Sequence, residues 1–395
     1  MPRLRFPGFE GEWLEHNLED CLSVCCKRNK GRFTKEEVLS VSGEFGIVNQ
    51  IAFQGRSFAG ESIVNYKTIS PGLIVYTKSP LREAPYGIVK ASRATNGIVS
   101  PLYGVYSAND GINACFIEAY FANALRRNRY FKPLVNLGPK HTMCISDDGA
   151  LGGSIVIPKK DEQDKICELL DVLDSRITVQ RHLVELLKKH KRGLHSAIFG
   201  QKCRVVNADG KPWSAWRQVR IGDIFQERSE RGGTADELLS VTINNGVKRQ
   251  ADTDKKDSSS EDKSNYKKVL PGDIVYNTMR MWQGASGVSP WAGIVSPAYT
   301  VIYPRGQQNT TFWAYAFKYW RLIQEFQKFS QGLTSDTWNL KYPQLSDIRV
   351  YEPSMGEQEA IVDILSMLDE RVSAAEQELN KMRNLKSGLL QQLFV

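Results

Sequence analysis

The segment DEQDK (161–165) comes nearest to a catalytic motif in this sequence. Spaced carboxylates followed by a lysine can bind a divalent metal ion and activate water for phosphodiester cleavage. However, the segment lies at the expected start of a helix, where acidic side chains are favoured by the exposed amide groups. A related segment later in the chain reads MGEQEA (355–360), which does not keep the pattern. We therefore predict capping or surface roles for the carboxylates of 161–165.

Other catalytic signatures are absent from the sequence. It has no Gly-rich phosphate loop after a strand, no serine-hydrolase elbow, no HExxH, and no Asn-Pro-Pro-aromatic tetrapeptide of the kind that grips a flipped base. The seven cysteines form no CxxC pair, and the five histidines have no Cys or carboxylate at metal-ligand spacing. We predict reduced thiols, no metal site and no catalytic centre. This absence of catalytic motifs is typical of a protein that recognises a partner and does not catalyse a reaction.

Any functional residue must be positioned by the elements of a duplicated half-chain. Several segments of the first half recur in the second half, 195 to 200 residues later. This offset falls from 200 to 195 along the chain, which indicates a few net deletions in loops. In the longest match, eight of twelve positions are identical. The matching pairs are NYKTISPGLIVY (65–76) with NYKKVLPGDIVY (265–276), GIVSP (97–101) with GIVSP (293–297), and EQDKI (162–166) with EQEAI (357–361).

The first part of each half consists of short apolar runs separated by Gly, Pro and Asn. This spacing predicts a β-rich domain with some helix. GIVSP is interpreted as a buried strand that ends in a turn. Segments 116–131 and 311–329, at matching places in the two halves, are the helix candidates within these domains.

The last 40 or so residues of each half have almost no Gly or Pro, and their apolar residues recur with heptad spacing. Helices of about 35–40 residues cannot bury such a seam on a small domain, so we predict that they pair as an antiparallel intramolecular coiled coil. The alternative is two unrelated helices, each packed on its own domain. The predicted seam comprises Leu170, Leu173, Ile177, Gln180, Val184, Leu187, Leu365, Leu368, Val372, Ala375, Leu379 and Met382.

The predicted fold class is therefore α+β. Two β-rich domains related by pseudo-two-fold symmetry are joined by the two long helices. The predicted domains are 1–158 and 201–353, and the predicted helical segments are 159–200 and 354–395.

The charge distribution favours a polyanionic partner for the β-rich domains. The net charge is +8. Residues 1–158 carry 18 Lys and Arg against 14 Asp and Glu, a net +4, and residues 200–355 carry 21 against 16, a net +5. Residues 356–395 have 4 basic and 7 acidic side chains, a net −3, so this helix is expected to face a protein. No apolar run reaches the ~20 residues of a membrane helix, and the N-terminus has no apolar segment, so we expect a cytoplasmic protein without a membrane partner.

With these elements in place, the sequence resembles the specificity (S, HsdS) subunit of type I restriction–modification systems. The resemblance covers essentially the whole chain. In the helices it is carried by EQxxI…LLDxLDxRI and its counterpart in the other half. The other segments that carry it are PRLRFPGFEGEW (2–13), IVYNTMRMWQGASG (274–287), GIVSPAYTV (293–301) and TSDTWNLKYPQL (334–345).

The resemblance implies a non-catalytic subunit in which each β-rich domain is a target recognition domain for one half of a split site on double-stranded DNA. It also implies that the helices form a spacer that binds two adenine methyltransferase (M) subunits, and that restriction (R) subunits join this complex. No cofactor is then expected in this chain. S-adenosylmethionine, ATP and Mg²⁺ are expected in the partner subunits.

Candidate DNA contacts follow the strands of each recognition domain, where loops can present them to a groove. Arginine can pair bidentately with guanine and glutamine with adenine. The first domain lacks the RMWQ segment, so the two half-sites are expected to differ. The candidates are Arg280, Trp282 and Gln283, then Thr334, Ser335 and Trp338 in the second domain, and Lys78, Arg82, Arg93 and Asn96 in the first.

Two rival interpretations stay open from the sequence. The same architecture can serve another enzyme that combines restriction and methylation. A stand-alone DNA nuclease is less well supported, because it needs a carboxylate site that the sequence does not offer.

Overall fold

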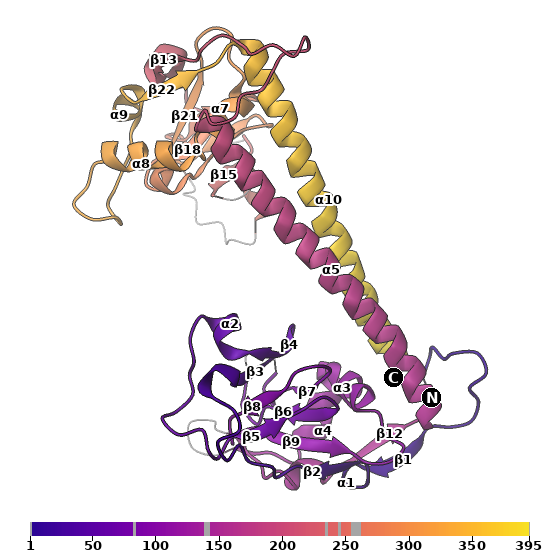
Figure 1. The fold of residues 1–395 in the computed structure, drawn as a ribbon. Coiled ribbons are helices and arrows are strands. Elements are labelled where there is room, and N and C mark those ends of the chain that lie inside the picture. The colour runs from indigo at the N-terminus through magenta and orange to yellow at the C-terminus, as the bar shows by residue number, and fades with distance from the viewer. Residues whose placement is uncertain are drawn as a thin grey trace. The chain divides into compact units, whose positions relative to one another are not determined.

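The computed structural model describes the chain except for residues 1, 82–83, 138–142, 234–235, 244–245, 254–261 and 395. It divides into two compact units. Unit 1 is Met1–Arg181 with Gln377–Val395, and unit 2 is His182–Glu376. Each unit holds one β-rich part, called head 1 or head 2 below, and a portion of each long helix (Figure 1). The domain bounds given above, which keep each helix whole, stay a prediction.

Head 1 is built on a four-stranded antiparallel sheet with the order β2-β9-β6-β7. Two-stranded pairs and short helices surround it. The sheet strands are β2 (Leu22–Val24), β6 (Leu73–Tyr76), β7 (Val89–Ala91) and β9 (Gly104–Ala108). The pairs are β1 (Leu14–Asn17) with β12 (Ser154–Ile157), β3 (Leu39–Ser42) with β4 (Gly46–Asn49), β5 (Lys67–Ile69) with β8 (Gly97–Val99), and β10 (Asn136–Leu137) with β11 (Met143–Cys144). The helices are α1 (Leu18–Cys21), α2 (Gln50–Gln54), α3 (Ala114–Ala122) and α4 (Ala124–Phe131), with 3-10 turns η1 (Lys35–Glu37) and η3 (Gly149–Leu151).

Head 2 repeats this plan, with the sheet order β14-β21-β18-β19. The shared strand order confirms the predicted duplication. Its sheet strands are β14 (Phe225–Glu227), β18 (Ile274–Asn277), β19 (Ser286–Val288) and β21 (Tyr299–Pro304). The pairs are β13 (Arg217–Arg220) with β22 (Arg349–Glu352), β15 (Leu239–Thr242) with β16 (Gly246–Arg249), and β17 (Lys267–Val269) with β20 (Gly293–Val295). The helices are α6 (Ile221–Ile224), α7 (Thr310–Ala316), α8 (Trp320–Phe329) and α9 (Tyr342–Ser346), with η4 (Gln250–Asp252) and η5 (Met281–Gln283).

The repeated Ile-Val-Tyr of β6 and β18 divides each head into two apolar clusters. Side chains alternate between the faces of a strand. Ile74 and Tyr76 therefore join the main core with the helices, while Val75 joins a smaller cluster on the opposite face. Residues 274–276 divide in the same way. Both faces of each sheet are covered, which explains why these strands are apolar throughout.

GIVSP forms a buried strand in both heads, as predicted. Gly97–Val99 (β8) and Gly293–Val295 (β20) are fully buried. Each glycine faces a backbone carbonyl so closely that a Cβ would lie 2.5 Å from Glu37 O at Gly97 and 2.4 Å from Glu237 O at Gly293. Only glycine fits such an approach, which accounts for the identity of this residue in both copies.

Segments 116–131 and 311–329, expected as single helices, are each broken into two. In head 1 the break falls at Asn123, whose side chain accepts hydrogen bonds from the backbone N–H groups of Leu125 and Arg126. This cap starts a new helix, α4, in a new direction. In head 2 the break lies between Ala316 and Trp320. The interruption follows from capping and turn geometry, which the apolar periodicity did not reveal.

The long helices are α5 (Lys160–Phe199) and α10 (Met355–Leu393). They lie side by side in Figure 1. Eight of the twelve predicted seam residues are buried, and Gln180, Leu187, Val372 and Met382 are half-buried.

Repeated ion pairs between the helices show their antiparallel direction. In unit 1 Asp174 of α5 binds Lys386 of α10, and in unit 2 Asp369 of α10 binds Lys191 of α5. The two pairs are related by the repeat offset of 195. In unit 2 the pair Lys188–Glu376 (2.6 Å) lies next to the second. As residue numbers rise along α5, those of the partners on α10 fall, so the coiled coil is antiparallel as predicted. No helix within the described residues is long and apolar enough to cross a membrane.

Candidate nucleic-acid interface

The segment 280–284 of head 2 forms a tight turn that is anchored by a buried side chain. Met281 is completely buried, while Arg280 is exposed and Trp282 and Gln283 are half-buried. The indole N–H of Trp282 donates to the carbonyl oxygen of Met279 at 3.0 Å. Gly284 ends the turn in the left-handed region, at φ 81°. The buried Met281 side chain fixes the turn, which presents the exposed Arg280 and the half-buried Gln283 at a defined place.

The second predicted loop of head 2 lies against this turn. The rings of Trp282 and Trp338 meet edge to face, with centroids 5.1 Å apart and an interplanar angle of 80°. The backbone N–H of Leu340 donates to the carbonyl oxygen of Thr278 at 2.9 Å. Thr334 and Ser335 are exposed on the same loop. The structure therefore brings the turn with Arg280, Trp282 and Gln283 against Trp338, and Thr334 and Ser335 lie further along the loop of Trp338. These six residues are called the head 2 reading surface below.

Sequence reasoning missed Leu333, which is the most exposed apolar residue of this loop. Its side chain is 100% exposed. The loop around it is closed at its base by paired backbone hydrogen bonds between Gln331 and Asn339. A leucine flanked by Gly332 and Thr334 has no distinctive signal in the sequence.

In head 1 the loop that follows β6 is equivalent to the one that contains the turn 280–284, and it holds Lys78. Its ammonium binds Asp147 at 2.7 Å, and Asp147 also binds the buried Lys67 at 2.5 Å. Partial burial disfavours the charged form of Asp147, but hydrogen bonds and charges from the two lysines outweigh it and lower the pKa of this carboxyl. Lys78 is thus held in an internal network, unlike Arg280.

Arg93 and Asn96 lie at the opposite end of the β6–β7 hairpin from Lys78. Because β6 and β7 are antiparallel, the end of β7 lies beside the start of β6. Arg93 binds Glu118 of α3 at 2.7 Å and Asp171 of α5 at 3.0 Å. These contacts tie head 1 to its helix, which favours a structural role for Arg93. Asn96 is exposed. Arg82 lies outside the described residues. Of the other three candidates of head 1, Lys78 lies at one end of the hairpin, and Arg93 and Asn96 lie at the other.

Burial of Glu162 is incompatible with a surface role, so that expectation was wrong for this residue. Glu162 is 2% exposed and forms a bidentate pair with Arg5, with both N···O distances 2.8 Å. In unit 2 Glu357, which is completely buried, binds Arg204 at 2.7 and 3.2 Å. The pairs clamp the segment that precedes each head onto the start of the helix that follows it.

The glutamines that follow these glutamates add hydrogen bonds between the start of each long helix and the head that precedes it. Gln163 accepts from the backbone N–H of Asn113 at 2.9 Å and donates to the carbonyl of Pro158. Gln358 accepts from the backbone N–H of Asn309 at 3.0 Å and donates to the carbonyl of Pro353. The repeated Glu-Gln was visible in the sequence, but its partners were not, because they are distant along the chain.

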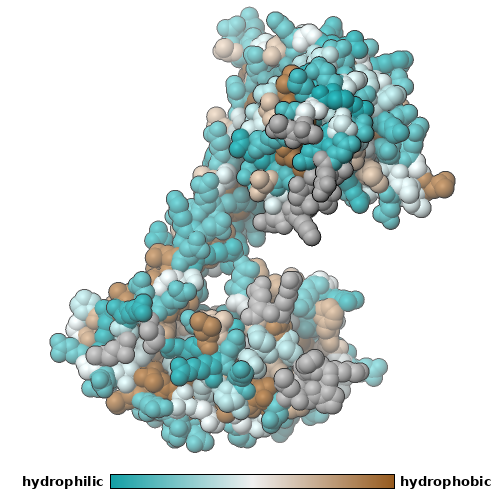
Figure 2. Space-filling model, turned by 180° about the vertical axis from the view of Figure 1, so that it is seen from behind, coloured by the Kyte–Doolittle hydropathy of each residue, from teal (hydrophilic) through white to brown (hydrophobic). Residues whose placement is uncertain are grey.

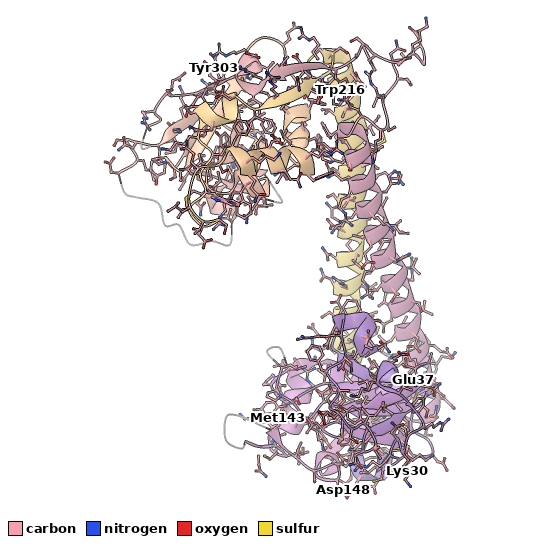
Figure 3. The ribbon with its side chains drawn as sticks, turned by 60° about the vertical axis from the view of Figure 1, so that its left-hand side comes forward. Lys30, Glu37, Met143, Asp148, Trp216 and Tyr303 are labelled. Carbon is pink, nitrogen blue, oxygen red and sulfur yellow. The ribbon has the colours of Figure 1, made fainter. Side chains whose placement is uncertain are left out.

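Each head has a cleft where it meets the helix pair, at matching places. The cleft of unit 1 (≈ 820 Å³) is lined by Trp13 and Phe394, and that of unit 2 (≈ 570 Å³) by Trp216 and Phe199. Trp13 and Phe394 meet edge to face at 6.1 Å, and Trp216 and Phe199 at 6.5 Å. Trp216 lies beside the helix pair in Figure 3. On the face shown in Figure 2, hydrophobic residues form only small separate patches.

Comparison with known families assigns the second half of the chain. Residues 214–383 match the family model of the type I restriction modification DNA specificity domain. This part of the chain is similar to a type I DNA specificity domain. It extends from the entry of head 2 through most of α10 and includes the whole head 2 reading surface.

Solved structures show the same fold over the whole chain. One is the S subunit of a type I restriction–modification system from M. genitalium, with a TM-score of 0.60, 15% identity, and coverage of 100% of this chain and 99% of that chain. Another, from work on complex assembly and conformational transition of the type I R-M system, has a TM-score of 0.53, 15% identity and 98% coverage of both chains. No curated protein sequence matches significantly. The resemblance to specificity subunits is confirmed by the specificity domain and by this shared fold.

Proposed function

We propose that this chain is the DNA-recognition subunit of a type I restriction–modification complex and reads a split, asymmetric site with one head per half-site. The observation that carries the proposal is the gathering of Arg280, Trp282, Gln283 and Trp338 on one surface of the specificity domain. Arginine and glutamine can read guanine and adenine edges in the major groove. The basic excess of both heads supports contacts with phosphates.

The half-sites differ in this proposal because the heads present different groups in the equivalent loops that follow β6 and β18. Head 2 presents the exposed Arg280, whereas Lys78 of head 1 is bound by Asp147. Base contacts in head 1 then come from other side chains, and Asn96 is an exposed candidate outside the ion pairs that hold Lys78 and Arg93. The exposed loop residues Thr334 and Ser335 extend the surface of head 2.

The helix pair holds two M subunits in this proposal, and R subunits join that complex in the cytoplasm. Clefts at matching places in the two units support a partner that binds twice. This chain itself is non-catalytic, while S-adenosylmethionine, ATP and Mg²⁺ bind to the partners. The commitment of Glu162 to Arg5 and of Asp164 to Lys160 argues against the nuclease alternative, since these carboxylates are already bound within the protein.

A map of methylated adenines in cells that express this chain with its M subunits tests the function. The wild type should give a split motif that disappears without this gene. Arg280→Ala and Gln283→Ala should each weaken discrimination by about 1–3 kcal/mol at one base of one half-site, because a bidentate contact is lost. Arg220→Ala, at an exposed arginine of β13, is the matched control and should leave the motif intact.

Two results would overturn the proposal. One is an unchanged motif in both Arg280→Ala and Gln283→Ala. The other is methyl transfer or DNA cleavage by the purified chain alone, which an adaptor cannot perform.

A further inference from the structure

Lys318 contacts the turn 280–284 of head 2, called the reading turn, from the interior of the head. It belongs to the break between α7 and α8, and its side chain is half-buried. Its ammonium donates to the carbonyl oxygen of Gly284, at the end of the turn, and to that of Ile243, just after β15, at 3.0 Å. One side chain therefore connects the reading turn to the β15–β16 hairpin and to the helical layer.

The surroundings explain why these carbonyls are the partners of Lys318. Titratable groups of the same cleft are Lys188, Lys191, Arg192 and His195 on α5 and Asp369 on α10. Asp369 is already bound by Lys191 and by the hydroxyl of Tyr315, at 2.6 Å from the latter. His195 contacts the carbonyl oxygen of Tyr315 at 2.9 Å. In the part of the chain that the structure describes, the ammonium of Lys318 thus has carbonyl partners and no carboxylate.

Close packing makes the connection rigid. A Cβ on Gly287 of β19 would lie 2.7 Å from the Cα of Gly246, so the hairpin and the sheet touch through their backbones. A Cβ on Gly284 would lie 3.5 Å from the Cδ of Lys318. The stem of the lysine therefore packs under the turn while its ammonium binds the turn's last carbonyl.

Head 1 has no equivalent of this lysine. The capping residues Asn113 and Asn309 correspond at an offset of 196. At this offset, Ala122 is the head 1 residue equivalent to Lys318. The loop after β6 is instead fixed by the pair of Lys78 with Asp147. Each head therefore fixes its loop with a lysine, but from a different element.

We propose that Lys318 is a positioning residue that sets how strictly head 2 reads its half-site, by holding the turn 280–284 against the β15–β16 hairpin. The effect on reading rests on the proposed function, whereas the effect on the turn does not. Base discrimination requires side chains held to within about 0.5 Å, so a turn released from its anchor reaches alternative bases. Lys318 itself need not touch DNA.

The protonation of Lys318 provides an independent readout. Burial lowers its pKa to about 8, so the ammonium is present below that pH and is lost above it. A charged donor forms a stronger bond to a carbonyl than a neutral amine does. The turn should therefore loosen between pH 7 and pH 9. Because the pKa is lowered on folding, deprotonation favours the folded chain from about pH 8 up to the unfolded pKa, so global stability changes in the opposite direction.

Hydrogen exchange of the full-length protein tests the anchor without DNA. The reporters are the turn amides of Arg280, Gln283, Gly284 and Ala285, which donate to carbonyls within 277–281. In Lys318→Met these amides should exchange about tenfold faster at pH 7, as expected for loss of a charged hydrogen bond. Lys328→Met, at an exposed lysine of α8, is the matched control and should leave them unchanged.

The pH profile and a conservative variant separate anchoring from general damage. After correction for intrinsic rates, the turn amides of the wild type should exchange faster at pH 9 than at pH 7. Lys318→Arg should abolish this change, because a guanidinium stays charged. Unchanged exchange in Lys318→Met would overturn the proposal, as would an equal increase throughout head 2, which indicates general loosening.

The methylated-adenine map then tests the consequence for reading. In Lys318→Met the half-site of head 2 should accept additional bases at about tenfold higher frequency, while the other half-site stays unchanged. Faster exchange of the turn with an unaltered motif would overturn the role in reading. Absence of any split motif in the wild type would instead overturn the proposed function, and the exchange result would still decide the anchor.

Discussion

Glu162 and Glu357 are buried carboxylates whose charges are each balanced by one arginine from a segment far away in the sequence. A buried ion pair adds little net stability relative to an apolar pair, but the loss of one partner leaves a desolvated charge. The glutamates therefore make each head dependent on the short segment that precedes it. This dependence can be measured with single substitutions.

Arg204→Met should destabilise unit 2 by about 3–5 kcal/mol, because the completely buried Glu357 is left without its cation. Urea unfolding followed by probes in each unit measures the effect. The double variant Arg204→Met with Glu357→Leu should recover much of the loss, since it removes both charges. An unfolding curve of Arg204→Met identical to that of the wild type would contradict this interpretation of the clamp.

Single residues also show how far the sequence predicts the site. Arg280, Trp282 and Gln283 were found because they follow a strand within six residues. Their contact with Trp338 was not predicted, because 56 residues separate the two tryptophans and only tertiary packing joins them. Lys318 and Arg5 were missed for the same reason. A lone lysine that binds carbonyls and an arginine paired across 157 residues leave no local pattern.

The β3–β4 hairpin of head 1 is an element whose tip contacts the helix pair. Glu44 binds Arg383 of α10 and lies 3.9 Å from Arg181 of α5. Arg181 also lies over the ring of Phe45, 4.5 Å from its centroid. In unit 2 the equivalent helix positions are Glu376 and Lys188, which pair directly. Unit 1 thus has two arginines, Arg181 and Arg383, where unit 2 has an acid and a base. Glu44 of the hairpin supplies the negative charge that balances them.

Glu44→Gln should release this hairpin with only a small loss of global stability. The pair is half exposed, so we expect a change of about 0–1 kcal/mol that shrinks further as salt is added. Hydrogen exchange of residues 42–46 should rise more than that of the sheet strands. Glu36→Gln, on the neighbouring 3-10 turn, is the control. Equal protection of the hairpin in Glu44→Gln and in the wild type would contradict the predicted tie.

The elements themselves were largely predictable, and the reason is local periodicity. The heptad spacing of α5 and α10 and the apolar strands are patterns within one element, and the structure confirms them. The breaks after Ala122 and Ala316 were not predicted, because a side-chain cap and a short turn interrupt a continuous apolar pattern. Periodicity reports which face is buried and does not report where the axis changes direction.

At the scale of the whole molecule, the chain ends reproduce an internal connection. The backbone N–H groups of Arg3 and Leu4 donate to the carbonyl of Gln392, at 2.9 and 3.2 Å. Lys202 and Cys203 donate in the same way to the carbonyl of Ala197, at the equivalent place of the repeat. The hydrogen bonds that join the end of α5 to the residues directly after it therefore recur between the end of α10 and the N-terminal residues.

A circularly permuted chain should therefore fold and keep its function. Residue 394 would be joined to residue 3 through a linker of about five residues, and new ends would be opened within 207–210, an exposed turn. The expected result is cooperative unfolding and a methylated motif like those of the wild type. A chain opened within β18, with the same linker, is the control that should fail. Loss of folding in the first permutant alone would contradict the equivalence of the two connections.

The ion pairs Asp174–Lys386 and Asp369–Lys191 have an evolutionary consequence. Each half contributes one acid and one base at the same two positions, so either half is complementary to a copy of itself. An ancestral gene of half this length could have encoded a working homodimer that read a palindrome. Under the proposed function, fusion of two such genes would let each head diverge, and exchange of one half would change one half-site.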